Sequence, residues 1–218
     1  MNQIISDESR MIVDTVRRFV QEKVQPLEME VDELGHIPTE KLAALKTEAI
    51  SLGLYAMNMP EAVGGGGLSS LDMCLVEEQL GLTSDAQIRR IFGQVYPMLM
   101  ACSPEQCSRY LEPTVKGDKI CAMAITEPDA GSDAAAIKST ANKENGDWVI
   151  NGTKHFISDG DIADYIIVMA LTDPEKRARG GITLFLIDKD TPGFSVARTQ
   201  AMMGHRGYGH AELVFSDC

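Results

Sequence analysis

The chain has 218 residues and a formal net charge of −12, with 32 acidic against 20 basic residues. It contains no Lys/Arg-rich run that could follow a phosphate backbone, which argues against nucleic acid as a partner. Its 44% hydrophobic residues can bury a core, and its five scattered cysteines lack the spacing of a zinc site. Because neither a signal core nor a membrane-length apolar run occurs, we expect a soluble, cytoplasmic, metal-free globular protein.

The first half of the chain predicts amphipathic helices. From Ile12 to Val24 apolar residues recur every three or four positions, which indicates one helix face, and Pro26 should end that helix. A second helix should follow Pro38 and stop at Gly53, where a left-handed cap fits. Its apolar face would comprise Leu42, Leu45, Ala49 and Leu52.

Further helices should follow in the same half. Ser69 and Asp72 resemble a capping box. A fourth helix should run from Ile88 to Leu99. Ser103-Pro104-Glu105-Gln106 then supplies an N-cap, a proline at the first helical position and a capping glutamine. The third helix, which this capping box would begin, carries Leu71, Cys74 and Leu75.

After Lys116-Gly117-Asp118 the pattern changes to short β-branched runs between turn residues. We therefore predict an α+β protein, with an N-terminal helical domain over 1–118 and a central β-domain over 119–218. Asn145-Gly146 and Asn151-Gly152 predict two consecutive hairpins, because both residues of Asn-Gly accept positive φ. The other runs predict strands of a compact barrel or sandwich: Ile120 to Thr126, Tyr165 to Ala170, Ile182 to Ile187, Phe194 to Arg198 and Ala211 to Phe215.

The most unusual stretch is Ala124-Ile125-Thr126-Glu127-Pro128-Asp129-Ala130-Gly131-Ser132-Asp133, where a strand leads into a polar loop. Such a loop can turn backbone N–H groups and hydroxyls toward one ligand. Composition alone favours a simpler interpretation, a connection built from Asx and Ser turns. The order of the residues adds the information that composition lacks.

This stretch resembles the acyl-CoA dehydrogenase signature, in which a small or apolar pair precedes Thr-Glu, then Pro, then Gly-Ser-Asp and small residues. Pro60 to Gly65 resembles the loop between helices of that family, and Asn151 to Gly160 resembles the strand along its flavin. Thr191 to Phe194 and Met203 to Gly207 resemble its closing β-segment. The resemblance covers the N-terminal helical and central β-domains, without the C-terminal helical bundle.

The resemblance implies FAD as the cofactor and assigns roles to the loop residues. Ile125 and Thr126 would reach the pyrimidine end of the flavin, where donors stabilise the charge that builds at N1 and O2. Gly131 would allow close approach of the backbone to the cofactor. Ser132 would contact the flavin phosphate or the acyl-pantetheine arm of the substrate.

Phe156 and Ile157 would pack on the flavin ring, with the Ser158 hydroxyl aimed at N5. Most relatives have Trp and Thr in place of Phe156 and Ser158, but an aromatic face and a hydroxyl are retained. An alternating strand with one core face is the simpler interpretation of the same residues, and the two are compatible. The basic loop residues Lys176, Arg177 and Arg179 could meet coenzyme A phosphates, although a solvated loop is favoured.

The family reaction removes an α-proton from an acyl-CoA thioester while hydride leaves the β-carbon for flavin N5, which gives a trans-2-enoyl-CoA. The base is a Glu of the C-terminal helical domain, and no residue up to Cys218 aligns with it, so the catalytic residue is unknown. Glu127, Asp129 and Asp133 belong to the cofactor loop and are not assigned as the base. We expect this segment alone to be inactive.

The resemblance further implies an acyl-CoA substrate, a place in fatty acid metabolism and electron-transfer flavoprotein as the acceptor. A homo-oligomer is expected when the C-terminal domain is present. Two alternatives stay open. The fold could serve a flavin monooxygenase or nitroalkane oxidase, or the chain could be a non-catalytic remnant that binds flavin or protein partners.

Overall fold

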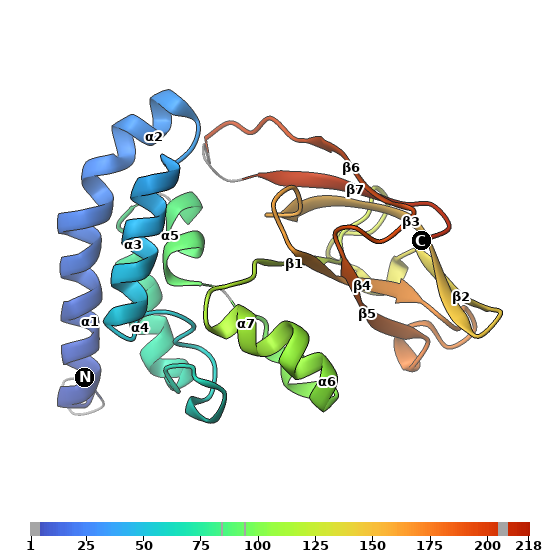
Figure 1. Cartoon of the computed structure of the whole chain (residues 1–218), viewed down its shortest axis with the longest axis horizontal. Helices are drawn as coiled ribbons and strands as arrows, with labels where there is room; N and C mark the ends of the chain where they lie inside the picture. Colours follow the sequence, from blue (N-terminus) through green and yellow to red (C-terminus); the bar gives the residue numbers. More distant parts are fainter. Residues whose placement is uncertain (1–4, 84, 94, 205–208) are drawn as a thin grey trace. The chain divides into compact units, whose positions relative to one another are not determined.

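The computed structural model describes residues 5–83, 85–93, 95–204 and 209–218. Tertiary contacts divide the chain into two compact units. The helical unit comprises Met1–Asp118 with Met203–Tyr208, and the β unit comprises Lys119–Met202 with Gly209–Cys218. Figure 1 labels the helices of the first unit and the strands of the second. The predicted fold class, a helical part followed by an all-β part, is confirmed.

In the described residues the helical unit consists of α-helices joined by short π and 3₁₀ turns. In chain order these are α1 (Asp7–Phe19), η1 (Val20–Val24), η2 (Gln25–Leu27), α2 (Glu28–Leu34), α3 (Thr39–Ser51), η3 (Glu61–Val63), α4 (Ser70–Leu80), α5 (Asp85–Phe92), η4 (Pro97–Ala101), α6 (Pro104–Gln106), η5 (Cys107–Leu111) and α7 (Glu112–Val115). Of the helices described, none combines the length and the apolar character needed to cross a membrane.

The first helix changes its winding and does not end at Pro26. α1 passes into the π turn η1 and the 3₁₀ turn η2, which leads directly into α2. Pro26 lies in the first turn of η2, where its missing N–H is tolerated, so the predicted helix end is wrong. The predicted apolar face is confirmed, because its members Val16, Phe19, Val20 and Val24 are buried.

α3 and its cap agree with the sequence, since Gly53 adopts a φ of +70° directly after the helix. Leu52, however, is 49% exposed and lies off the buried face. Ser69 caps α4 as predicted, accepting the backbone N–H of Asp72 at 3.2 Å. On α4, Leu71 and Cys74 are exposed, and the buried side chains are Val76, Gln79 and Leu80.

The predicted fourth helix is shorter than expected. α5 ends at Phe92, because Gly93 takes a φ of +66° and lies so close to the Tyr55 ring that a Cβ would be 2.2 Å from its Cζ. Leu99 therefore belongs to the separate 3₁₀ turn η4, although it is buried. The capping box at Ser103 and Gln106 is confirmed at the start of α6.

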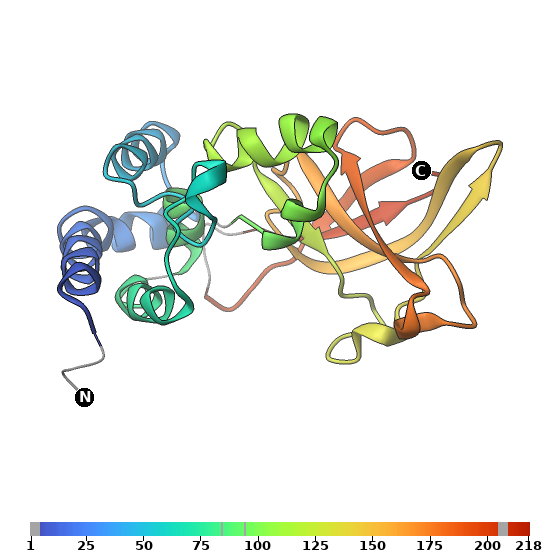
Figure 2. The same ribbon diagram turned by 90° about the horizontal axis from the view of Figure 1, so that it is seen from below.

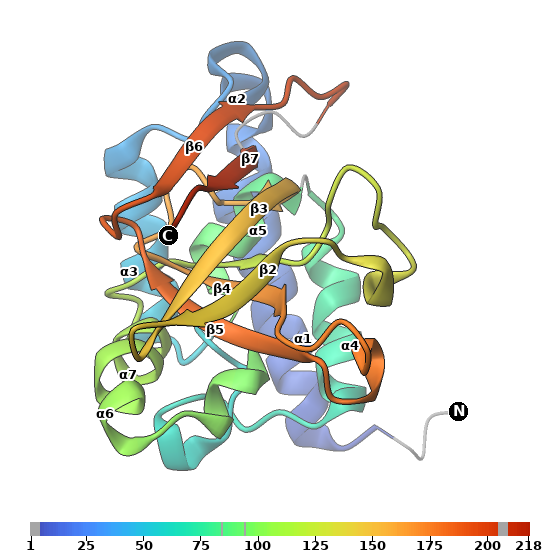
Figure 3. The same ribbon diagram turned by 90° about the vertical axis from the view of Figure 1, so that its right-hand side faces the viewer.

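In the described part of the β unit, seven strands form one sheet with the order β1-β4-β2-β3-β7-β6, and β5 also pairs with β4. β1 and β4 are parallel, whereas the β2–β3, β3–β7, β4–β5 and β6–β7 pairs are antiparallel. Figures 2 and 3 show the sheet curling, so that β2 and β3 cross β4 and β5. The strands are β1 (Cys121–Ala124), β2 (Thr140–Glu144), β3 (Asp147–Ser158), β4 (Tyr165–Leu171), β5 (Ile182–Asp188), β6 (Phe194–Thr199) and β7 (His210–Phe215).

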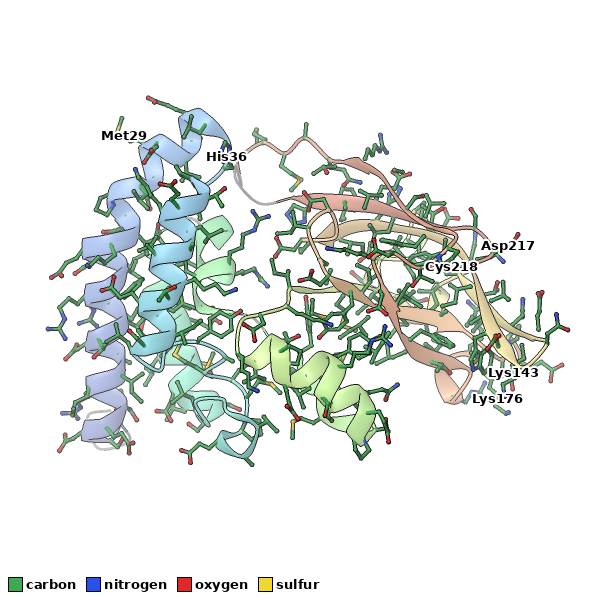
Figure 4. All side chains as sticks on the ribbon, viewed as in Figure 1. Met29, His36, Lys143, Lys176, Asp217 and Cys218 are labelled. Atoms are coloured by element: carbon green, nitrogen blue, oxygen red, sulfur yellow. The ribbon has the colours of Figure 1, made fainter. Side chains whose placement is uncertain are left out.

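Of the two predicted hairpins, only the first exists. Asn145 and Gly146 have φ values of +53° and +98° and join β2 to β3. At Asn151-Gly152 β3 continues without a turn, so the second hairpin is wrong. Gly152 is needed there for a different reason, since a Cβ would lie 2.2 Å from the Ser139 Oγ. The Asn151 side chain donates to Asp217, a residue labelled in Figure 4, at 3.0 Å.

Candidate functional site

The loop after β1 lies against the second half of β3. The backbone N–H of His155 donates to the Thr126 carbonyl at 2.8 Å, and the Lys154 ammonium donates to the Ile125 carbonyl at 3.0 Å. Thr126 is therefore beside His155, which lies three positions before Ser158 on β3. We call the set Ile125, Thr126, Phe156 and Ser158 the candidate site.

A buried ion pair joins this loop to β3. Lys154 Nζ lies 2.7 Å from Glu127 Oε1, and the two side chains are 0% and 4% exposed. The other carboxylate oxygen accepts the backbone N–H of Lys138 at 2.6 Å, and Oε1 also accepts that of Ser139 at 3.0 Å. Sequence reasoning assigned no role to Lys154. Lys154 lies between Thr153 and His155, so no apolar pattern in the sequence marks it as buried.

The charges of this pair depend on their hydrogen bonds. Burial favours a higher pKa for Glu127, but the hydrogen bonds from Lys154 and from the backbone of Lys138 and Ser139 outweigh it and hold the pKa below its usual value. Burial lowers the pKa of Lys154, against the attraction of Glu127. A carboxylate with a lowered pKa, locked to an ammonium, is poorly suited to accept a proton near neutral pH.

The loop beyond Glu127 is a tight turn followed by exposed residues. The backbones of Glu127 and Ala130 exchange hydrogen bonds of 2.9 and 3.2 Å. Gly131 and Ser132 follow on the surface, and a Cβ added at Gly131 would meet nothing within 4 Å. No neighbour in the described chain therefore requires glycine here. Asp133 then caps a short 3₁₀ turn, η6 (Ala134–Ala136), by accepting the N–H of Ala135 at 3.1 Å.

Phe156 is held in an unusual conformation. It adopts a φ of +56°, a left-handed value that costs a bulky residue about 1–3 kcal/mol, and its side chain is 54% exposed. The pairing of β3 with β7 shifts register between Lys154 and Ile157, which is the signature of a β-bulge. Ile157, in contrast, is 2% exposed and packs in the β core, so only its backbone remains for a ligand.

Ser158 and His155 each meet a side chain from β7. Ser158 Oγ lies 3.3 Å from His210 Nδ1, and the tautomer of His210 decides which atom donates. The ring of His155 lies edge-on to that of Phe156 with centroids 5.7 Å apart, and its Nε2 is 2.9 Å from Glu212 Oε2. These two β7 residues were not predicted to be near the candidate site.

The basic loop carries short contacts of its own. Lys176, labelled in Figure 4, pairs with Asp173 at 2.7 Å, and Arg177 donates to the carbonyl of Ala135 in η6 at 3.1 Å. Arg179 is exposed in the 3₁₀ turn η7 (Arg177–Arg179). His205, Arg206 and Gly207 of the expected closing β-segment lie outside the described residues. Across the ranges that are described, no group of three or more His, Cys, Asp or Glu side chains is arranged to hold a metal ion.

The helical unit contains a separate cavity of about 220 Å³ between α4 and α5. Its wall combines apolar side chains with the polar side chains of Asn58, Glu77 and Arg89. The lining residues are Met57, Asn58, Met73, Glu77, Leu80, Gly81, Ile88, Arg89, Phe92 and Gly93.

Comparisons with known proteins agree with this architecture. The family model of the acyl-CoA dehydrogenase N-terminal domain matches residues 6–118, and that of the middle domain matches residues 122–218. The chain therefore belongs to the acyl-CoA dehydrogenase family.

Several curated relatives are identical to this chain at about a third of the aligned positions. Benzylmalonyl-CoA dehydrogenase of Aromatoleum aromaticum is 34% identical over 98% of this chain and 56% of its own length. The mitochondrial short-chain specific acyl-CoA dehydrogenase of Homo sapiens is 34% identical over 96% of this chain and 50% of its own length. The solved FAD complex of PigA has a TM-score of 0.84 at 31% identity and covers 98% of this chain and 56% of that one. The chain thus spans about half the length of these relatives.

Proposed function

We propose that this chain carries the flavin-binding part of an FAD-dependent enzyme that oxidises an acyl-CoA thioester to a trans-2-enoyl-CoA. Membership of the acyl-CoA dehydrogenase family supports the class of reaction, and the FAD complex of PigA supports the cofactor. Because the chain spans about half the length of its relatives, the reaction is assigned to a complete catalytic assembly. This chain alone is expected to be inactive.

The exposed aromatic ring of Phe156 is the observation that carries the proposal. A strained φ of +56° and a β-bulge hold a side chain that is 54% exposed at the end of β3 where Thr126 also lies. Strain of this kind persists where function requires it, and bulges are frequent beside active sites. The surface at Gly131 also leaves room for a bound group, because a Cβ added there would meet nothing within 4 Å.

The residues of the candidate site have the chemistry to hold an isoalloxazine ring. Phe156 would cover one face, the Ser158 hydroxyl would donate toward N5, and Ile125 and Thr126 would place donors at the pyrimidine edge. Bound FAD would supply hydride acceptance from the β-carbon of the acyl thioester. Ser132, exposed in the loop, would contact the flavin phosphate or the pantetheine arm.

The base that removes the α-proton is proposed to lie outside this segment. Glu127 is a buried carboxylate beside the candidate site, but Lys154 and two backbone N–H groups hold it ionised with a lowered pKa. A general base needs a pKa closer to the working pH. We therefore assign Glu127 to structure and expect a glutamate elsewhere in the complete assembly to be the base.

The substrate and partners follow from the family in the same way. We propose an acyl-CoA substrate of unassigned chain length, a role in fatty acid metabolism, electron-transfer flavoprotein as acceptor and a homo-oligomeric complete assembly. Two other functions remain: a flavin monooxygenase or nitroalkane oxidase on the same fold, and a non-catalytic flavin- or partner-binding chain. Each of the flavin-dependent functions would use the same candidate site.

The first test is a titration of the purified chain with FAD, followed by flavin fluorescence and visible circular dichroism. We expect saturable binding that Phe156→Ala weakens and Trp148→Ala, an exposed aromatic change elsewhere on β3, leaves unchanged. Absence of binding, or equal loss in both variants, would count against the proposed site.

The second test uses the chain assembled with a C-terminal helical domain of the family. Bleaching of the bound flavin by an acyl-CoA under anaerobic conditions supports dehydrogenation. Product that forms only with oxygen indicates the monooxygenase or oxidase function. Bound flavin that no acyl-CoA bleaches indicates a non-catalytic chain.

A further inference from the structure

We infer that Lys154 is a positioning residue for the candidate site: its buried ammonium, acting with Glu127, holds the cofactor loop against β3. This inference rests on the proposed flavin-binding function. It concerns a residue that does not itself touch the proposed cofactor but fixes the backbone of residues that would.

Lys154 contacts the beginning of the loop at two points. Its ammonium donates to the Ile125 carbonyl at 3.0 Å and to Glu127 Oε1 at 2.7 Å. Lys154 stands on β3 two positions before Phe156, and its side chain is fully buried. One side chain thus sets the distance between the strand that carries the exposed aromatic ring and the segment that carries Thr126.

Glu127 extends this connection to the end of the loop. Its carboxylate accepts the backbone N–H groups of Lys138 and Ser139, at 2.6 and 3.0 Å. These residues directly precede β2, so the segment from Glu127 to Ser139, which contains Gly131 and Ser132, is closed at both ends by one carboxylate. We call Lys154 and Glu127, with the three backbone groups they bind, the loop clamp.

A contribution to stability alone does not explain why the loop clamp uses a buried charged pair. A buried ion pair can often be replaced by apolar residues with little cost or even a gain in stability, because desolvation offsets the attraction. The backbone groups of Ile125, Lys138 and Ser139 leave the regular sheet pattern here and would lose their partners in such an exchange. A charged pair at this place therefore fixes one loop conformation, which an apolar pair would not do.

The test compares Lys154→Met, Glu127→Leu and the double variant with wild type. A matched control is Lys23→Met with Glu48→Leu, which removes an ion pair of 3.3 Å from the helical unit, away from the loop, with side chains 46% and 40% exposed. Three quantities are measured: unfolding by urea, hydrogen exchange of the apo chain over residues 125–139, and FAD affinity by fluorescence titration.

Each single variant leaves one charge buried without its partner, so we expect lower stability, faster exchange and weaker FAD binding. The double variant should recover part of the stability, because no charge is left buried without a partner. Its Lys138 and Ser139 amides should still exchange at least about tenfold faster than in wild type, and FAD should bind at least about tenfold more weakly, as expected for lost hydrogen bonds. The control should match wild type in all three quantities.

A double variant with wild-type exchange over 125–139 and wild-type FAD affinity would overturn the inference. So would exchange and affinity that recover together with stability, because that pattern indicates a purely structural pair. If wild type itself fails to bind FAD, the proposed function fails, and the exchange of the apo chain still decides whether the loop clamp exists.

Discussion

The backbone of Gly152 passes the side chain of Ser139 so closely that a Cβ at Gly152 would lie 2.2 Å from the Ser139 Oγ. The φ of Gly152 is +151°, a value that other residues rarely adopt. We therefore expect Gly152→Ala to lower the free energy of unfolding by about 1–3 kcal/mol, measured by urea denaturation. Gly131→Ala, where a Cβ meets nothing within 4 Å, is the matched control and should unfold like wild type. Equal stability of both variants would contradict this account of Gly152.

Phe156→Asn should separate stability from ligand binding. Asn tolerates the left-handed φ of +56° better than a bulky aromatic residue. The free energy of unfolding, measured by urea denaturation, should therefore stay equal or rise by about 1 kcal/mol. FAD affinity should fall because the exposed ring is lost. Trp148→Asn, which also removes an exposed aromatic residue from β3, should not gain stability. A Phe156→Asn chain that binds FAD like wild type would exclude the ring from the cofactor site.

Lowering the pH should reduce the free energy of unfolding of the β unit, because Glu127 becomes protonated. Its pKa lies below the usual 4.5, so as the pH falls the unfolded chain takes up the proton before the folded chain does. The stabilisation is present above pH 4.5 and is lost as the pH falls through the lower folded pKa. Unfolding free energies measured across this range should decline less steeply in the Lys154→Met/Glu127→Leu double variant. Identical slopes would show that Glu127 does not carry this dependence.

Raising the pH should reduce the free energy of unfolding of the helical unit, because Tyr55 becomes ionised. Burial, with a further contribution from the negative charge of Asp118, raises its pKa to about 12 from 10.0. Because the folded chain holds the phenol proton more tightly, the free energy of unfolding should fall as the pH rises from 10.0 to about 12. Tyr55→Phe should show a shallower decline, and ultraviolet titration should lose one tyrosinate step near pH 12. A step that persists in this variant would assign the raised pKa to another tyrosine.

The sequence was most informative where a local rule decides the structure. The 3.6-residue period of α1, the cap at Gly53 and the Asn145-Gly146 turn depend on residues close in the chain, and all three are as predicted. Asn151-Gly152 is the same dipeptide as the turn at Asn145-Gly146, but it lies within β3. There the glycine is required by the close approach of Ser139, a neighbour that no local pattern reveals.

The candidate site was predictable only in part. Sequence order indicated that the loop after β1 and the segment around Phe156 belong together, and the structure places Thr126 beside His155. The burial of Lys154 depends on Glu127, 27 residues earlier, and so has no local signal. The exposure of Phe156 depends on a bulge against β7, which breaks the alternation that a strand pattern assumes.

The π turn η1 (Val20–Val24) gives the long N-terminal helix one place where its length can change. A π turn accommodates an extra residue within an otherwise α-helical segment. Deleting one residue in η1, such as Glu22, would restore ordinary winding and leave the residues on either side facing as they do now. The same deletion inside α1 would rotate every later side chain by about 100° and turn Phe19 away from the core. Insertions and deletions among homologous sequences should therefore collect at η1.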